Sequence, residues 1–462
     1  MNSIDSQQRT RYNTFLDSGS MAQPHLAIAD ADRVHEYVFS PRELKLIRGG
    51  SSLQRKLNLT LGDLAREKGA DKILTCNGGT VLATFPDKGP AKNFCGAAEL
   101  LFLKETYGAT VTTALTPYTD DTFAEDRKRL IFTKLEYNKR SVRRPTFHAA
   151  YPWFAICGAC GLYPAVEEES NDVLCAACRK RREYSGRTKD APPDLGAMGK
   201  LSNPENYLAI VYIDIDRLGR FLGKQIKTKE DCETWSTAID AAVTQSVEGA
   251  CQSLKRDGDF APYEILLAGG DDALIALPAS SVFDFLAAFR LRFQEHRRKH
   301  GMPPYSIGLV IAHSHFPIAE FVSLAEDLLR SAKSVHDSDS IHYAVLTASL
   351  ADRLSVRGSQ SADGLRRTGN PYRLPRFLEL TTQLREMKGM EAPASKIRDL
   401  YRISHQPQLH AEVEYAHLLT RLEARHAAAL RTSLGGSLWC EENGLPFTVA
   451  ADLAELWDFI HV

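Results

Sequence analysis

The pattern of apolar positions along the chain predicts two copies of one arrangement of strands and helices. Apolar runs that end in an Asp-x-Asp motif predict buried strands at His25–Asp32 and Tyr207–Asp216. In each copy a helical segment follows, and then two apolar arms joined at a pair of glycines, Lys72–Phe85 and Glu264–Pro278, predict a hairpin. With a further helix and strand in each copy, the order β-α-β-β-α-β is typical of a ferredoxin-like palm whose helices cover one sheet face.

The second copy carries acidic residues where a metal ion would be useful. Asp214 ends the first strand, and Gly269-Gly270-Asp271-Asp272 forms the hairpin connection. Neighbouring strands lie about 4.8 Å apart, so these carboxylates could share a divalent ion. The glycines leave room for a phosphate, and such a site suits nucleotidyl transfer. The alternative is structural: Asp214 ends a strand, Asp216 caps a helix, and the glycines form an ordinary turn.

The first copy differs at its hairpin. Asn77-Gly78-Gly79-Thr80 stands in place of the acidic turn, so this hairpin should hold no metal. Upstream, Arg48-Gly49-Gly50-Ser51-Ser52 has two interpretations: a phosphate- or ribose-binding turn, because glycines expose N–H groups and serines donate hydrogen bonds, or a plain helix-breaking loop. Lys333, near the end of a helix predicted at Phe316–Ser334, could reach substrate phosphates or simply end the helix favourably.

Four cysteines between the two copies indicate a metal site of another kind. They form two Cys-x-x-Cys pairs, Cys157 with Cys160 and Cys175 with Cys178. Two such pairs this close together are typical of a tetrahedral structural zinc site. A redox pair is a poorer interpretation, because two pairs occur and no βαβ pattern surrounds either.

Composition and charge narrow the class of protein. The chain is 44% hydrophobic and 25% charged with formal net charge −1, as in a soluble globular protein, and this balance argues against coating nucleic acid by bulk charge. A basic stretch, Arg127–Arg144, interleaved with Phe132 and Tyr137, is either a solvated face or an RNA contact. No membrane span or signal segment is expected, and a cytoplasmic location follows from these features.

These patterns predict an α+β chain of five parts. They are a loose tail at 1–21, a first palm at 22–150, a zinc ribbon and linker at 151–196, a second palm at 197–356, and a helical domain at 357–462. The helical domain has no acidic or thiol cluster and is expected to be a packing or partner surface. His342–Leu346 is expected to be an edge strand of the second palm.

The combination resembles the large, polymerase-like subunit of type III CRISPR effector complexes. The resemblance rests on the four-cysteine ribbon together with Leu44–Leu53, Tyr212–Gly219, Gly269–Asp272 and Ile311–Pro317, and it extends to Asp194-Leu-Gly and the helical C-terminal domain. It implies conversion of ATP into cyclic oligoadenylates. It further implies that Asp214, the Ile215 carbonyl, Asp271 and Asp272 hold Mg²⁺ or Mn²⁺, while Gly50 and Ser51 of the first palm hold one ATP.

The chain also departs from that family's usual pattern. The HD nuclease domain is missing, so no DNase activity is expected, and much of the usual insertion between the palms is absent. The resemblance implies assembly with guide or target RNA and other effector subunits. The departures favour the alternative, a stand-alone, homo-oligomeric relative.

Two other functions stay open. Diguanylate cyclases share the palm, but Leu218 and Leu222 stand where that family has a phenylalanine and a guanine-reading asparagine. A non-catalytic RNA-binding scaffold is the third interpretation, and the acidic residues Asp214, Asp271 and Asp272 argue against it.

Overall fold

The computed structural model describes residues 23–141, 155–169, 172–186, 190–254, 259–346, 364–442 and 444–461. The predicted tail, Arg143, Arg144 and part of each predicted linker lie outside these ranges. The chain divides into two compact units. The first comprises Met1–Val34, Gln54–His148 and Leu222–Thr237, and the second comprises His35–Leu53, Ala149–Phe221 and Ala238–Val462.

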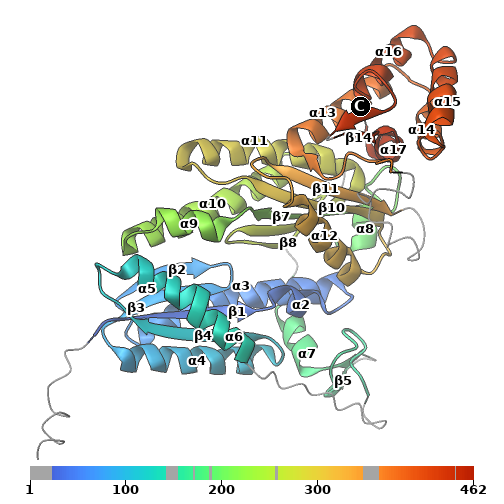
Figure 1. The fold of residues 1–462 in the computed structure, drawn as a ribbon. Helices are drawn as coiled ribbons and strands as arrows, with labels where there is room; N and C mark the ends of the chain where they lie inside the picture. The colour runs from blue at the N-terminus through green and yellow to red at the C-terminus, as the bar shows by residue number, and fades with distance from the viewer. Residues whose placement is uncertain are drawn as a thin grey trace, which may run out of the picture. The chain divides into compact units, whose positions relative to one another are not determined.

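The first unit contains a four-stranded antiparallel sheet in the order β2-β3-β1-β4 (Figure 1). Its strands are β1 (His25–Asp32), β2 (Lys72–Asn77), β3 (Thr80–Phe85) and β4 (Thr110–Pro117). Helix α3 (Leu44–Glu67), whose first turns belong to the second unit, separates β1 from β2, and α4 (Lys88–Thr106) separates β3 from β4. The predicted β-α-β-β-α-β order is therefore confirmed for this copy.

Both faces of the first sheet are covered. On one face, Phe94 of α4 stacks on Phe85, and Gly62 of α3 contacts Cys76. On the other face, Leu26 and Ile28 belong to a core built with α5 (Phe123–Arg129), η1 (Leu130–Leu135) and residues from 226 to 235. Helix α6 (Glu136–Ser141) follows η1.

One outer edge of the first sheet, that of β4, is covered by side chains. Lys134 donates to the Leu115 carbonyl over 3.1 Å, and Asn138 donates to the Thr113 carbonyl over 2.7 Å. Both carbonyls belong to β4, which has no strand beyond it among the described residues.

The second unit has a six-stranded sheet in the order β12-β11-β10-β7-β9-β8. Its strands are β7 (Tyr207–Ile215), β8 (Glu264–Gly269), β9 (Asp272–Pro278), β10 (Tyr305–His313), β11 (Ser340–Leu346) and β12 (Tyr372–Arg373). The strand predicted at His342–Leu346 begins two residues earlier, at Ser340, and β12, which follows the second linker, pairs with those first two residues, Ser340 and Ile341.

Helices lie on both faces of the second sheet as well, so the prediction of a single covered face was wrong. Helix α11 (Val282–His300) packs Phe289 and Phe293 against Tyr305 on one face, and α10 (Lys229–Gln252) lies beside it through Gly249. Helix α12 (Ile318–Ala332) crosses the other face so closely that a Cβ on Gly308 would collide with the Ala325 carbonyl. Short helices α8 (Leu195–Gly199) and α9 (Leu218–Gln225) flank β7.

The C-terminal part is mainly helical, as predicted. Its helices are α13 (Leu374–Gly389), α14 (Ala394–Ser404), α15 (Gln408–Thr420), α16 (Ala424–Ser433) and α17 (Ala450–Leu456). A short hairpin of β13 (Cys440–Glu442) and β14 (Leu445–Phe447) was not predicted. Asp452 of α17 is fully buried and accepts hydrogen bonds from Tyr343, Thr368 and Tyr372. This carboxylate ties the helical part to β11 and β12.

No helix among the described residues is long and apolar enough to cross a membrane.

Candidate functional site

The acidic site lies where β7 and β9 meet. In the antiparallel register of these strands Asp214 stands directly opposite Asp272, and the Ile215 N–H donates to the Asp271 carbonyl over 3.2 Å. Gly270, at φ 68°, adopts the left-handed conformation that the turn requires. The structure thus sets Asp214 opposite Asp272 and joins the backbones of Ile215 and Asp271, as the strand pattern predicts. The carboxylate oxygens of Asp214, Asp271 and Asp272 are not gathered into a close ligand set.

A lysine side chain also contacts the acidic site. Lys333, at the C-terminal cap of α12, donates to the Asp214 carboxylate. Of the two roles that the sequence left open for Lys333, the structure shows the end of the helix, and the contact with substrate phosphates stays a prediction. Burial raises the pKa of Asp214 to about 7; the Lys333 ammonium opposes this shift, and Asp271 and Asp272 add to it. A neighbouring positive charge stabilises the ionised form of such a partly buried carboxylate.

Three further residues support the turn, and sequence reasoning missed all of them. Asp240 of α10 accepts the Gly270 N–H over 2.7 Å and so fixes the turn. The Tyr212 hydroxyl donates to Asp272 over 3.2 Å and lies 3.1 Å from Nδ1 of His35. A signal existed for Tyr212, which precedes Asp214 by two residues and so shares its sheet face. Neither Asp240 nor His35 has a comparable signal in the sequence.

The Arg48–Ser52 segment is neither a turn nor a helix-breaking loop, so both interpretations of its local structure were wrong. It lies inside α3. Its glycines allow close packing: a Cβ on Gly49 would collide with the Arg181 carbonyl, and one on Gly50 would lie 3.4 Å from the Cα of Val38. Ser51 is only 9% exposed. Arg48 forms a two-pronged ion pair with Glu264 of β8, with N–O distances of 2.8 and 2.5 Å.

Part of the basic stretch makes contacts within the first unit. Arg127 is buried, Arg129 pairs with Asp126 at 2.6 Å, and Lys139 pairs with Asp30 at 2.5 Å. Lys134 donates a hydrogen bond to the Leu115 carbonyl at the edge of β4. Phe132 and Tyr137 are exposed. Three of the six basic residues that the structure describes in this stretch therefore have partners in the first unit, namely Arg129, Lys134 and Lys139.

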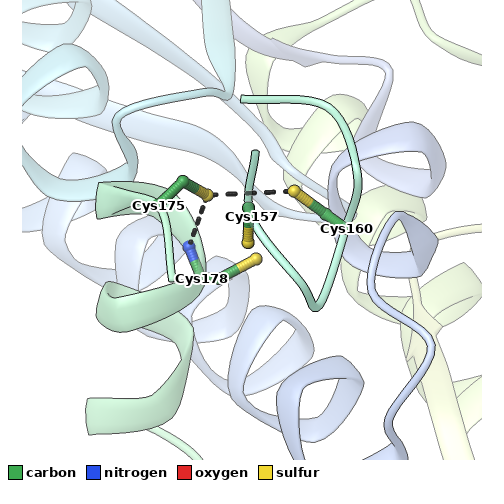
Figure 2. A group of neighbouring side chains, drawn as sticks. All are labelled: Cys157, Cys160, Cys175 and Cys178. Atoms are coloured by element: carbon green, nitrogen blue, oxygen red, sulfur yellow. Dashed lines mark hydrogen bonds between the residues drawn. The ribbon is translucent and has the colours of Figure 1, made fainter. Parts of the chain in front are cut away.

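The four cysteines form a second site (Figure 2). The sulfur atoms of Cys157, Cys160, Cys175 and Cys178 all lie within 4.8 Å of one another, and three of the four residues are buried. Cys175 caps the N-terminus of α7 (Ala176–Glu183), and Cys160 comes from the facing loop. Four thiols in this arrangement fit a zinc ion, as the spacing predicts. This is the one set of three or more closely grouped metal-ligating side chains in the described ranges.

Comparison with protein families finds a match for part of the chain. Residues 207–342 match the model of the second palm domain of Cas10/Cmr2. This segment is similar to the second palm domain of that family. It contains every residue of the acidic turn, and it ends within β11. A search of curated proteins gave no match.

Solved structures of Csm1 share the fold. Csm1 of T.onnurineus aligns with a TM-score of 0.64 at 15% identity over 95% of this chain and 69% of that one. A Csm1–Csm4 cassette in complex with cA4 aligns with a TM-score of 0.61 at 15% identity over 94% and 69%. The same cassette with AMPPNP gives a TM-score of 0.57 at 15% identity over 82% and 62%. The chain therefore spans about three fifths to two thirds of the length of these proteins.

Proposed function

We propose that this chain is a metal-dependent nucleotidyltransferase that joins ATP into cyclic oligoadenylates or a cyclic dinucleotide, as part of CRISPR-type antiviral defence. The single observation that carries the proposal is the register that sets Asp214 opposite Asp272, next to a glycine turn bearing Asp271, within a Cas10-type palm. Its fold neighbours were solved with an ATP analogue and with cA4, which agrees with this substrate and product class.

In this proposal Asp214, Asp271, Asp272 and the Ile215 carbonyl hold Mg²⁺ or Mn²⁺. Oxygen ligands of this type suit a hard divalent cation, which would activate a 3′-hydroxyl and stabilise the leaving pyrophosphate. The chain's own residues provide the frame: Asp240 fixes Gly270, and Tyr212 fixes one oxygen of Asp272. Gly269 and Gly270 leave room for a phosphate beside the acidic turn.

Lys333 has a natural role in the same scheme. Its ammonium contacts Asp214 in the structure, and it would be released towards substrate phosphates once a metal ion takes over the charge of that carboxylate. Gly50 and Ser51 remain proposed nucleotide ligands, with the first sheet as a second, degenerate palm that accepts one ATP. Since both residues are buried in α3, ATP binding there requires the helix packing around Gly50 to open.

The proposal extends to domains and partners. The five-part division, with palms at 22–150 and 197–356 around a zinc ribbon, is kept as the arrangement of the chain. Csm1 was crystallised with Csm4, so a subunit of that type is the proposed protein partner, with guide and target RNA entering through the assembly.

The test is mass spectrometry of products after the purified chain is incubated with all four ribonucleotides and Mg²⁺ or Mn²⁺. Wild type, Asp271→Ala/Asp272→Ala and the surface control Asp63→Ala are compared, Asp63 being 77% exposed at its side chain. Cyclic adenylates from wild type and the control, but not from the double variant, support the proposal. Cyclic diguanylate would indicate the diguanylate-cyclase alternative.

If no product forms from any variant, the assay is repeated with a co-purified Csm4-type subunit and RNA. Continued absence of product, with RNA retained by wild type and by the double variant alike, would overturn the enzyme proposal in favour of a scaffold.

A further inference from the structure

A buried arginine joins the four-cysteine site to the rest of the second unit. Arg181 of α7 is only 1% exposed, and its Nη1 donates to the sulfur of Cys178 over 3.2 Å. Four thiolates around a zinc ion carry two net negative charges, and a buried cation beside them offsets part of that charge. Arg181 is therefore placed to stabilise the loaded site from outside the ligand set.

The same guanidinium holds a short helix, α2 (Val34–Phe39). Its Nη2 donates to the Tyr37 carbonyl over 2.5 Å, and the guanidinium carbon lies 4.2 Å from the centre of the Tyr37 ring. On another side Val38, which is fully buried, packs against Gly50 of α3. Helix α2 is thus held between the zinc ribbon and the start of α3.

The N-terminal end of α2 reaches the acidic site. Nε2 of His35 lies 3.5 Å from an oxygen of Asp272, and both ring nitrogens lie within 3.2 Å of the Tyr212 hydroxyl. The His35 ring also packs at 5.1 Å from the Tyr212 ring. Only one residue, Glu36, separates His35 from Tyr37, whose carbonyl Arg181 holds.

We propose that α2 is a positioning element through which the four-cysteine site, by way of Arg181 and Tyr37, sets the place of His35 and hence of Asp272. The Arg181 and His35 contacts all lie within the second unit. Loss of zinc or of the Arg181 side chain loosens α2, and His35 then no longer braces the Tyr212–Asp272 pair. His35 is a positioning residue in this scheme, and the role assigned to Asp272 rests on the proposed function.

The test measures hydrogen exchange by mass spectrometry on the full zinc-loaded chain. Wild type is compared with Arg181→Met, His35→Ala, the double variant, and Lys180→Met as a control on the same helix, where Lys180 pairs with Glu183. Arg181→Met is expected to raise exchange in peptides covering 35–39 and 269–274. His35→Ala should raise exchange in 269–274 alone, and Lys180→Met should leave both peptides unchanged.

Metal titrations give a second, independent measurement. Competition with a chromophoric chelator should show zinc affinity lowered on the order of 10-fold by Arg181→Met and unchanged by His35→Ala. Mn²⁺ affinity, measured by the paramagnetic resonance signal of the free ion, should fall in both single variants. The double variant should lose no more than the stronger single one, because both act along one path.

Unchanged exchange at 269–274 in Arg181→Met, or fully additive losses in the double variant, would overturn the inference. Should Arg181→Met fail to fold, stepwise removal of zinc from wild type replaces it, with the same two peptides as the measurement. Wild type that binds no Mn²⁺ would count against the proposed function only, since hydrogen exchange still reports on the path from zinc to Asp272.

Discussion

The four strands of the first sheet and their four equivalents in the second, β8-β9-β7-β10, follow the same order and differ at a few side chains near the hairpin. In each sheet the strand with the Asp-x-Asp motif pairs with the second arm of the hairpin. This pairing sets Thr80 opposite Asp30 in the first sheet and Asp272 opposite Asp214 in the second. Each hairpin has a register shift in its first arm, and each first aspartate contacts a lysine, Lys139 or Lys333. Two exchanged positions therefore separate the sheets: Thr80 stands at the place of Asp272, and Gly79 at the place of Asp271. The first sheet pairs its single carboxylate at this point with Lys139, whereas the second brings two further carboxylates to the turn.

The glycine turns are also fixed in parallel ways. Asn77 of the first hairpin donates to the Ser236 side chain over 3.0 Å and to its carbonyl over 3.1 Å. Gly270 of the second donates to Asp240, one helical turn later along α10. The first turn is therefore held by a neutral amide, whereas the second is held by a carboxylate through its backbone. This leaves its side-chain positions free to carry acidic groups.

The largest expected difference is in catalysis. Asp272→Asn removes a charge from the proposed metal site and should lower product formation on the order of 100-fold or more, because metal stabilisation of the transition state is worth several kcal/mol. Thr80→Val at the equivalent position of the first hairpin should change product formation less than about twofold, since no charge is lost there. Quantitative mass spectrometry of products from the two variants measures this ratio. Equal losses would show that the two hairpins contribute alike.

The next difference concerns how closely a helix crosses each sheet. Gly308 pairs with Tyr212 in the second sheet, and Ala114 pairs with Ile28 at the equivalent place in the first. Gly308→Ala should destabilise the protein by about 1–3 kcal/mol, because the added methyl meets the α12 backbone. The reverse change, Ala114→Gly, should cost about 0.5–1 kcal/mol. Urea unfolding curves test this order, and a tolerated Gly308→Ala would contradict the close crossing.

A smaller effect is expected where α10 fixes the two turns. Asp240→Ala leaves the Gly270 N–H without its acceptor and should cost about 1–2 kcal/mol. Ser236→Ala should cost a few tenths of a kcal/mol, because Asn77 keeps its bond to the Ser236 carbonyl. Hydrogen exchange of the Gly270 amide and thermal unfolding together distinguish the two variants. Comparable costs would remove the contrast between the turns.

The smallest effect tests the paired lysines. Lys139→Met breaks the ion pair with Asp30 and should lower stability by about 1 kcal/mol or less, since the pair is partly exposed. Lys333→Met should instead raise the KM for ATP while leaving Mn²⁺ affinity at least as high as in wild type, because the lysine competes with metal for Asp214. Reduced Mn²⁺ affinity in Lys333→Met would show that the lysine supports the metal site instead.

The strands and acidic turns could be predicted because they depend on local patterns. Alternating apolar runs and paired glycines specify hairpins, and register then places Asp214 opposite Asp272 without further information. The four cysteines were equally readable from their spacing. Each of these features is specified by residues that lie close together in the sequence. The structure confirms the strands, the hairpins and the grouping of the four sulfur atoms.

What could not be predicted depends on partners far along the chain. The Arg48–Ser52 segment looks like a loop because it contains two glycines, and only Arg181 and Val38 explain why a helix needs them there. The ion pair of Lys139 in the basic stretch could not be predicted, because its partner Asp30 lies about a hundred residues earlier in the chain. The pairing of β12 with the first two residues of β11 could not be predicted either, because β12 lies beyond a predicted linker. The contacts of His35 and Asp240 are not predicted by any local sequence pattern.

The closed edge of the first sheet has a consequence for association between molecules. An exposed edge strand offers unpaired backbone groups to any passing strand and is a common starting point for aggregation. On β4 the Lys134 and Asn138 side chains already occupy two such carbonyls, and they bring an ammonium group to that edge. A second chain would have to displace both before it could add a strand there, so this edge is protected against intermolecular pairing.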